Sequence, residues 1–305
     1  IRRPPRSTQS RSSAASDVYK RQGIMLAMEK AIYVTGITGF IGRNLLTHLS
    51  KKFIKVINFT RRDTIQIIEQ GHISEHEASS DLLLNNPARV LINLATLYDP
   101  YPKTSVQLKN LIESNILFPS RVVEMLRDND DLKIINALSY HQLLDFSCQN
   151  VYSLSKELFK IFLAHQSHEI VNVYIFDTFG SADTREKVTD TFIKQILAGC
   201  AITIPQNEIN INLSDSEAIS TSLMNSIQLS SGSYSLLSPN TISLESLALT
   251  IMDIVGVEVE IIKESIGNDH FSSLQALPES IFIAPSGYSF ENSLKKRINE
   301  IESKK

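Results

Sequence analysis

Short apolar runs alternate with longer amphipathic segments through the first half of the chain. The apolar runs cover residues 31–35, 55–59, 65–70, 89–95, 132–138 and 169–176. Between most of them, at residues 41–50, 78–84, 106–127 and 151–166, apolar side chains recur at helical spacing. Strands that alternate with helices need crossover connections, which favour parallel strands with helices on both faces. The pattern therefore predicts an α/β fold built on a doubly wound parallel sheet.

The pattern loosens beyond residue 178. Helical spacing recurs at residues 187–197, 215–228, 244–255 and 290–302, and only short strands separate these segments. This predicts a smaller C-terminal α+β lobe, residues 179–305, over the carboxyl edge of a first domain formed by residues 28–178. We expect residues 209–235 to pack back on the first domain. Doubly wound folds bind ligands at that edge, so the second lobe is expected to hold a substrate.

The first residues have a different composition. Residues 1–22 are rich in Arg and Ser, nearly free of apolar side chains and without periodicity, so they cannot join a core. They resemble the translated read-through of a sequencing adapter, which would make Met25 or Met28 the native start. The alternative is a native disordered basic tail. In either case we expect residues 1–27 to lie outside the fold.

Composition narrows the class of protein. Hydrophobic residues make up 42% of the chain, and no apolar run approaches the roughly 18 residues of a spanning helix. The net charge is −3, and without the basic tail the remainder is more acidic, which disfavours nucleic acid as a partner. Cys148 and Cys200 are the only cysteines, too few for a disulfide framework or a cysteine zinc cluster. We expect a cytoplasmic protein that binds neither membranes nor nucleic acid.

Three glycines mark the turn after the first strand. Gly36, Gly39 and Gly42 have the spacing G-x-x-G-x-x-G and lead into a helix. Without side chains at these positions, backbone N–H groups can approach a pyrophosphate at the positive end of the helix. The glycines could instead serve only a tight turn, but the flanking strand and helix favour a dinucleotide site.

Basic residues stand where the second strand ends. A cofactor with a free ribose 2′-hydroxyl is usually held there by an acid. This chain has Asn58, followed by Arg61 and Arg62. A guanidinium can hold phosphate oxygens through two parallel hydrogen bonds, so the sequence favours NADP over NAD. The alternative is a pair of solvated surface arginines.

A tyrosine and a lysine share one face of a predicted helix. Tyr152 and Lys156 are four residues apart, a spacing that is common on solvated helices and weak evidence by itself. A cation beside the phenol would lower the tyrosine pKa from about 10 toward neutrality and make it a general acid/base. Ser139 ends the preceding strand and faces the same edge of the sheet as the glycine turn.

Together these motifs resemble the extended short-chain dehydrogenase/reductase family, in its NAD-dependent epimerase/dehydratase group, which acts on nucleotide sugars. The resemblance is carried by TGITGFIG, RVLINLA and YSLSK. It implies a Rossmann sheet, with Ser139 orienting the substrate oxygen, Tyr152 as acid/base and Lys156 holding the nicotinamide ribose. Tyr152 and Lys156 also belong to the expected cofactor site, whose other members are Gly36, Thr38, Gly39, Phe40, Ile41, Gly42, Arg61, Arg62, His72, Leu94 and Ala95. The expected substrate contacts are Asn115, Asp177 and Thr178.

Two local features resemble a deoxysugar branch of that family. Thirteen positions separate Ser139 from Tyr152, and the late strand ends in FDTFGSADTREK instead of Asn-x-Tyr-Gly-Pro. Both features resemble the CDP-abequose and CDP-paratose synthases, NADPH-dependent C4 reductases of deoxysugar and O-antigen biosynthesis. Tyr140 and His141 stand where 4,6-dehydratases have an Asp-Glu pair, which disfavours dehydration. The resemblance thus implies an NADP(H)-dependent reductase of a keto-deoxyhexose nucleotide sugar.

Other functions stay open at this point. An NAD-dependent nucleotide-sugar epimerase would use the same catalytic group, and a non-catalytic Rossmann regulator would keep only the cofactor site. The intact catalytic group favours an enzyme. Because many relatives pair helices, a homodimer is a further hypothesis.

The sequence contains one pattern that is typical of zinc sites, which we interpret as a chance occurrence. His72, Glu75 and His76 spell H-x-x-E-H, which on a helix would place two imidazoles on one face. A third ligand has no evident source and the segment follows a predicted strand, so we expect a surface turn and no metal.

Overall fold

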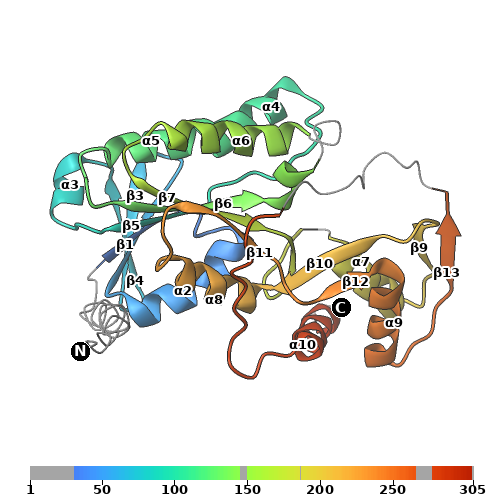
Figure 1. Ribbon diagram of the computed structural model, residues 1–305. Coiled ribbons are helices and arrows are strands. Elements are labelled where there is room, and N and C mark those ends of the chain that lie inside the picture. Colours follow the sequence, from blue (N-terminus) through green and yellow to red (C-terminus); the bar gives the residue numbers. More distant parts are fainter. Residues whose placement is uncertain (1–30, 145–149, 186, 266–276, 304–305) are drawn as a thin grey trace, which may run out of the picture.

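The computed structural model describes residues 31–144, 150–185, 187–265 and 277–303; the expected tail of residues 1–27 and Cys148 lie outside these ranges. The strands of its main sheet are β1 (Ala31–Thr35), β2 (Lys55–Phe59), β3 (Thr64–Glu69), β4 (His72–Glu77), β5 (Val90–Asn93), β6 (Lys133–Ser139), β7 (Glu169–Ile175) and β11 (Gly232–Leu236). Their order is β11-β7-β6-β5-β1-β2-β3-β4 (Figure 1). All neighbours are parallel except β2 with β3 and β3 with β4. The predicted α/β class with a mostly parallel sheet is therefore confirmed.

Helices enclose the main sheet on both faces (Figure 1). One layer is formed by α2 (Phe40–Lys52) and α8 (Ser216–Ser226), and the other contains α3 (Ser80–Leu84), α4 (Ser105–Ile112), α5 (Phe118–Met125) and α6 (Val151–Ala164). Along β1, Ile32 and Val34 pack on the side of α2 and α8, whereas Tyr33 packs on the side of α5 and α6. The period of two along a strand thus supplies apolar side chains to two separate cores.

The hairpin of β3 and β4 gives the sheet an antiparallel edge. The sequence predicts a strand at residues 65–70 but a surface turn after it. Gln70 and Gly71 both have positive φ, 49° and 83°, which closes a two-residue turn and reverses the chain. The next residues form an exposed edge strand instead of a turn. His72 pairs with Glu69 at the amino edge of β2, away from the glycine turn, so its expected contact with a cofactor is not supported.

The helix predicted over residues 106–127 is interrupted. A π-helical turn spans Glu113–Leu117, between the end of α4 and the start of α5. Pro119 has no backbone N–H and cannot bond the carbonyl of Asn115, four residues earlier. The wider turn accommodates this missing bond and places Asn115 in the core at 1% exposure.

The second lobe has an apolar core of its own. Its strands are β8 (Asp177–Phe179), β9 (Ile202–Pro205), β10 (Asn210–Asp215), β12 (Thr241–Ser243) and β13 (Ile261–Glu264), and its helices are α7 (Val188–Leu197), α9 (Leu244–Val255) and α10 (Phe290–Glu302). Phe179, Phe192, Leu247 and Ile298 meet in this core. The predicted ranges of α9 and α10 are confirmed, because both helices carry a clear apolar stripe.

The chain returns from the second lobe to the main sheet. β11 pairs in parallel with β7, and α8 packs against the same core as α2. Ser235 on β11 accepts from Ile281 N at 2.9 Å and donates from its own N to Glu279 O at 2.8 Å, which covers this edge of the sheet. α8 and β11 therefore belong to the first domain although they follow residue 178, and the chain then enters the second lobe again.

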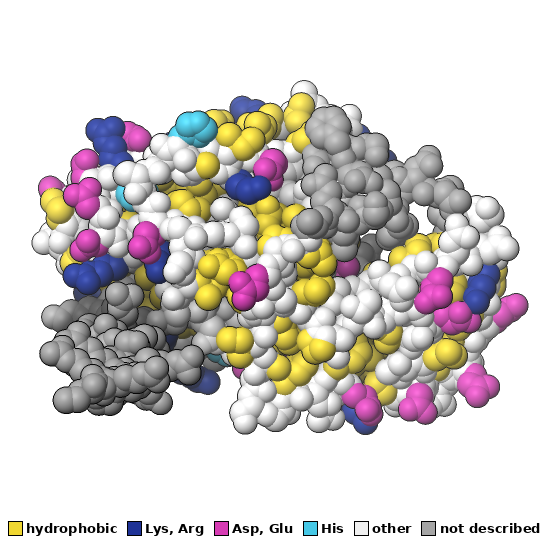
Figure 2. All heavy atoms as spheres, in the orientation of Figure 1, with side chains coloured by type: hydrophobic (Ala, Val, Ile, Leu, Met, Phe, Trp, Pro, Cys, Tyr) yellow, Lys and Arg dark blue, Asp and Glu magenta, His cyan; other side chains and the backbone are white. Residues whose placement is uncertain are grey.

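One outer surface has several exposed apolar side chains. Hydrophobic side chains lie along the upper edge of the molecule, over α4 and α6 (Figure 2). We call this surface the α4–α6 face. The exposed apolar side chains of α4 and α6 are Val106, Leu108, Ile112, Val151, Leu154, Leu158 and Ile161.

Candidate active site

A cavity of about 1050 Å³ lies at the carboxyl edge of the main sheet, with the segment 177–187 forming part of its wall. Parallel strands deliver their loops to one edge, which is why residues far apart in sequence meet there. The expected site residues that line the cavity are Gly36, Thr38, Gly39, Phe40, Ile41, Gly42, Arg61, Arg62, Leu94, Ala95, Ser139, Tyr152, Lys156, Asp177 and Thr178. The structure thus brings together the expected residues except His72 and Asn115.

Close backbone approaches shape the glycine turn. Gly36 has a φ of 73°, and a Cβ atom there would lie 2.8 Å from the Leu94 carbonyl carbon. A Cβ atom on Gly42 would lie 2.2 Å from the Gly36 carbonyl oxygen. Gly39 is the N-cap of α2, whose first turn contains no acidic residue. The glycines let β1, β5 and α2 approach closely, and the positive end of α2 fits the pyrophosphate of a dinucleotide.

At the end of β2 an amide stands in place of an acid. The Oδ1 atom of buried Asn58 lies 3.5 Å from the Ile37 backbone nitrogen, and its Nδ2 atom donates to Gln66 at 3.0 Å. Arg61 and Arg62 follow on the cavity rim, both exposed. This end of the cavity therefore presents two guanidinium groups and no carboxylate from β2.

Tyr152 is held at the inner wall by hydroxyl groups. Asn150 and Ser153 form a capping box at the start of α6, with hydrogen bonds of 2.9 and 3.0 Å, and this fixes the first turn. The Tyr152 hydroxyl is hydrogen-bonded to the side chains of Ser139 and Thr96. Ser139 ends β6 and Thr96 follows β5, so the phenol lies where two central strands end.

The pKa of Tyr152 moves opposite to the direction expected from the sequence. Burial raises it above 10, and the hydrogen bonds from Ser139 and Thr96 and the charge of Arg185 offset this only in part. Burial also lowers the pKa of Lys156 to about 8. Lys156 is 3% exposed, and within the described part of the chain its amine makes no hydrogen bond or ion pair. The phenol is thus kept protonated, and the buried amine fits the hydroxyls of a bound ribose.

Asn115 lies behind the cavity wall. Its Oδ1 atom accepts from Leu97 N at 2.6 Å, and its Nδ2 atom donates to Leu97 O at 3.1 Å and to Ser155 Oγ at 2.8 Å. These bonds tie the loop after β5 to α6. The expected substrate contact of Asn115 is therefore corrected: its amide is committed to holding the wall.

The segment after β7 carries charged residues into the cavity. Burial raises the pKa of Asp177 to about 6, while Lys187, Arg185 and a hydrogen bond from Tyr140 act against this shift. The Lys187 Nζ atom lies 4.0 Å from the centroid of the Tyr98 ring. Sequence reasoning did not assign Arg185 or Lys187 a role. The available signal was the basic pair in DTREK, directly after a late strand.

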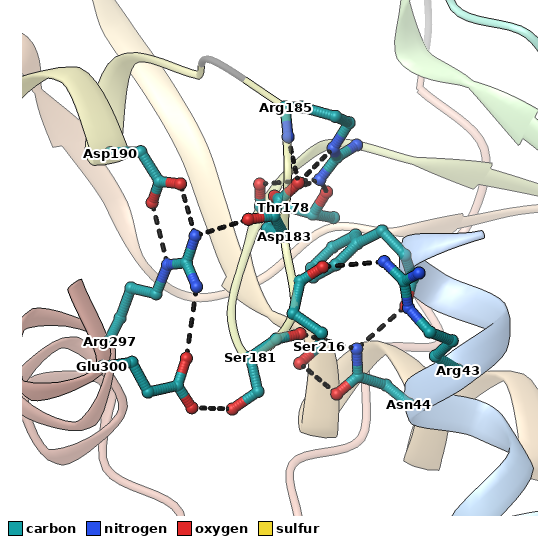
Figure 3. A network of polar contacts seen from close by, with 12 residues as sticks. Arg43, Asn44, Thr178, Ser181, Asp183, Arg185, Asp190, Ser216, Arg297 and Glu300 are labelled. Carbon is teal, nitrogen blue, oxygen red and sulfur yellow. Dashed lines mark hydrogen bonds and ion pairs between the residues drawn. The ribbon is translucent and has the colours of Figure 1, made fainter. Parts of the chain in front are cut away.

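Arg185 is fixed by its neighbours in the same segment. Its guanidinium donates to both carboxylate oxygens of Asp183, at 2.8 and 2.7 Å, and to Thr178 Oγ1 at 2.9 Å (Figure 3). The guanidinium carbon lies 4.4 Å from the centroid of the Phe40 ring at the start of α2. The side chain is therefore held against the start of α2.

A buried network connects this segment to α10. Arg297 donates to Asp190 on α7 at 3.0 and 2.5 Å and to the Asp183 carbonyl at 2.8 Å (Figure 3). On the other side, Arg43 of α2 donates to the Ala182 carbonyl at 2.8 Å. The segment that carries Arg185 is thus anchored to helices of both lobes.

Metal ligands are not gathered in the described ranges. No group of three or more His, Cys, Asp or Glu side chains there is arranged to hold a metal ion. His72 and His76 lie on the exposed strand β4. No helix in this part of the chain is long and apolar enough to cross a membrane.

Sequence comparisons agree with the geometry of the cavity. The profile of the NAD dependent epimerase/dehydratase family matches residues 32–211. The chain is 25% identical over 217 residues to a CDP-abequose synthase from Yersinia pseudotuberculosis. That alignment covers 67% of this chain and 75% of the relative.

Solved structures share the fold. The UDP-N-acetylglucosamine 4-epimerase from Methanobrevibacter ruminantium M1, in complex with UDP-N-acetylmuramic acid, has a TM-score of 0.69 at 18% identity, over 91% of this chain and 99% of that one. WbmF from Bordetella bronchiseptica, in complex with NADH, has a TM-score of 0.66 at 19% identity, over 92% of this chain and 94% of that one. At these identities the likeness extends to the fold alone.

Proposed function

The chain belongs to the NAD-dependent epimerase/dehydratase family of extended short-chain dehydrogenases/reductases, and from this premise we propose that it is an NADP(H)-dependent reductase of a keto-deoxyhexose nucleotide sugar. One observation carries the proposal. The Tyr152 hydroxyl is hydrogen-bonded to Ser139 and kept protonated by burial, in the cavity that contains the glycine turn. Reduction of a carbonyl needs such a proton donor, because the oxygen becomes an alcohol.

In the proposed reaction the cofactor supplies the hydride, and three side chains bind the reactants or transfer the proton. Bound NADPH would supply the hydride to the keto carbon. Tyr152 donates its proton to the keto oxygen, and Ser139 orients that oxygen through a second hydrogen bond. The Lys156 amine binds the ribose, and in its charged form it stabilises the phenolate that remains. Each role is a proposal that follows from where these groups lie in the cavity.

The preference for NADP rests on the end of β2. Asn58 offers no charge that would repel a 2′-phosphate, and Arg61 and Arg62 stand on the cavity rim. Guanidinium groups bind phosphate oxygens by charge-assisted hydrogen bonds. These features support NADPH over NADH as the preferred cofactor.

The substrate class rests on the segment 177–187. Lys187 gives the cavity a cation apart from those on the rim, and Arg185, which is paired with Asp183, lines the cavity beside it; basic groups here suit the diphosphate of a nucleotide sugar. Asp177 and Thr178 lie beside them and offer hydrogen-bonding groups to a hexose. The likeness to a CDP-abequose synthase favours a CDP-linked sugar.

Hydride transfer to a panel of nucleotide sugars tests the proposal. CDP- and UDP-linked 4-keto-6-deoxyhexoses are mixed with NADPH, and the nicotinamide absorbance is followed. We expect one keto sugar in the panel to be reduced, with one NADPH oxidised for each sugar molecule. Tyr152→Phe should reduce turnover by at least about 10²-fold, as expected for lost general acid catalysis. Tyr234→Phe, which removes a hydroxyl on β11 outside the cavity wall, is the control.

Other outcomes separate the alternatives. Interconversion of two sugars without net use of cofactor would identify an epimerase. Cofactor binding without turnover of any sugar in the panel would favour the non-catalytic regulator. Full activity of Tyr152→Phe would remove the proposed mechanism whatever the substrate.

A further inference from the structure

The β3–β4 hairpin brings a carboxylate to the same end of the cavity as the two arginines. Glu75 on β4 lines the cavity together with Arg61 and Arg62. In the sheet, Asn58 pairs with Gln66, and Gln66 pairs with Glu75. Because paired residues of neighbouring strands point to the same face, these three polar side chains form a row across β2, β3 and β4.

Neighbours on β3 hold Glu75 in place. Its Oε1 atom accepts from Thr64 Oγ1 at 2.7 Å, and it is also hydrogen-bonded to Gln66. The bond from Thr64 lowers the pKa of Glu75, with smaller contributions from Gln66 and from the charge of Arg62. No ion pair joins Glu75 to Arg62 in the part of the chain that the structure describes. The carboxylate and the guanidinium therefore present separate charges to a ligand.

We propose that Glu75 sets the choice between NADPH and NADH by opposing Arg61 and Arg62, a role that rests on the proposed nicotinamide-dependent function. A carboxylate accepts a hydrogen bond from the ribose 2′-hydroxyl of NADH and repels the 2′-phosphate of NADPH. The acid that is missing from β2 is thus supplied by β4, through the β3–β4 hairpin. The protein binds both cofactors, and its preference for NADPH is smaller than two arginines alone would give.

Cofactor titrations test this without any sugar substrate. The fluorescence of NADPH and NADH gives a Kd for each with the full chain and with Glu75→Gln. Glutamine keeps an acceptor for Thr64 and removes only the charge. We expect the ratio of the NADH Kd to the NADPH Kd to rise about threefold or more, and the rise to shrink at high salt because these groups are exposed. Glu69→Gln, at the opposite end of the same hairpin, should leave the ratio unchanged.

The outcomes separate this inference from the proposed function. An unchanged ratio in Glu75→Gln would overturn the role of Glu75 and leave the NADP(H) site standing. The same rise in Glu69→Gln would also overturn it, because net charge alone would then explain the effect. Binding of neither cofactor to the unmodified chain would overturn the proposed function and this inference with it.

Discussion

Burial lowers the pKa of Lys156 to about 8, so at neutral pH the folded protein carries an ammonium that bulk water would stabilise better. The unfolded chain has no such cost. Lys156 therefore lowers the free energy of unfolding, but it places a hydrogen-bond donor in the cavity. Such opposition between stability and function is common at active sites.

Replacing Lys156 by Met should raise stability at neutral pH. Between about pH 8 and 10.5 the unfolded chain binds more protons than the folded one, so this residue makes stability rise with pH across that window. We expect the gain, roughly 1 to 3 kcal/mol, to be largest below pH 8 and to vanish toward pH 10.5. Urea unfolding at a series of pH values measures it.

A control for this change lies one turn further along α6. Burial of Lys160 is outweighed by hydrogen bonds to Tyr174 and Glu157, which raise its pKa. Lys160→Met should therefore lower stability at neutral pH, the opposite sign. A Lys156→Met protein that is less stable at pH 7 would show that the ammonium has a favourable partner.

At this scale, short motifs could be read from the sequence and long-range neighbours could not. The glycine turn, Ser139 and Tyr152 were found because their spacing follows from one strand or helix and its adjoining turn. Glu75 lies at the cavity because β4 runs antiparallel to β3, and Arg185 lies there because of the path of the loop after β8. Neither can be read from the local sequence. Asn115 was expected to contact the substrate, but its amide holds the cavity wall. Residue type and sequence spacing do not distinguish an amide that binds a ligand from one that bonds the protein.

At the scale of elements, a buried ion pair joins α10 to α7, the helix that follows the segment carrying Arg185. Arg297 on α10 and Asp190 on α7 are 3% and 5% exposed at their side chains. Removing one partner of such a pair leaves a buried charge without compensation, which is more costly than losing an exposed pair.

Arg297→Met should cost about 3 to 5 kcal/mol of unfolding free energy, measured by urea denaturation, because it strands Asp190 in the core. Arg127→Met breaks the exposed pair with Glu124 and should cost less than about 1 kcal/mol. Equal costs for the two variants would show that Asp190 is neutralised in another way.

The elements were predicted unevenly. The ranges of α9 and α10 are confirmed, since an apolar stripe on a helix is a local pattern. The direction of β3 was not predictable from the apolar run, because strand periodicity is the same in both directions and the turn at Gln70 and Gly71 decides it. The break in the helix over residues 106–127 had a signal, Pro119, whose effect depends on how the wall packs.

At the scale of the whole molecule, the α4–α6 face needs an explanation. Leu154, Leu158 and Ile161 form a stripe along α6, and Leu158 is 55% exposed. Apolar stripes on adjacent helices suit pairing with an identical face across a twofold axis. We therefore expect a second copy of this chain as the partner.

Leu158→Glu should weaken that pairing by about tenfold or more, because it places a charge at the centre of an apolar contact. Sedimentation or light scattering across a concentration series measures the monomer fraction. Leu249→Glu on α9 changes a side chain of similar exposure, 53%, on another surface and is the control. A wild-type chain that stays monomeric at the highest concentrations would contradict the homodimer.

The position of β11 also bears on how the protein is made. β7 emerges from the ribosome before residues 232–236, and residues 279–281, which cover β11, emerge later still, so one edge of the main sheet stays open in the interval. An open strand edge is a template for pairing with other chains. The nascent protein is thus most prone to aggregate between the emergence of β7 and that of residues 279–281, and a stall in translation within this interval would be more harmful than one after it.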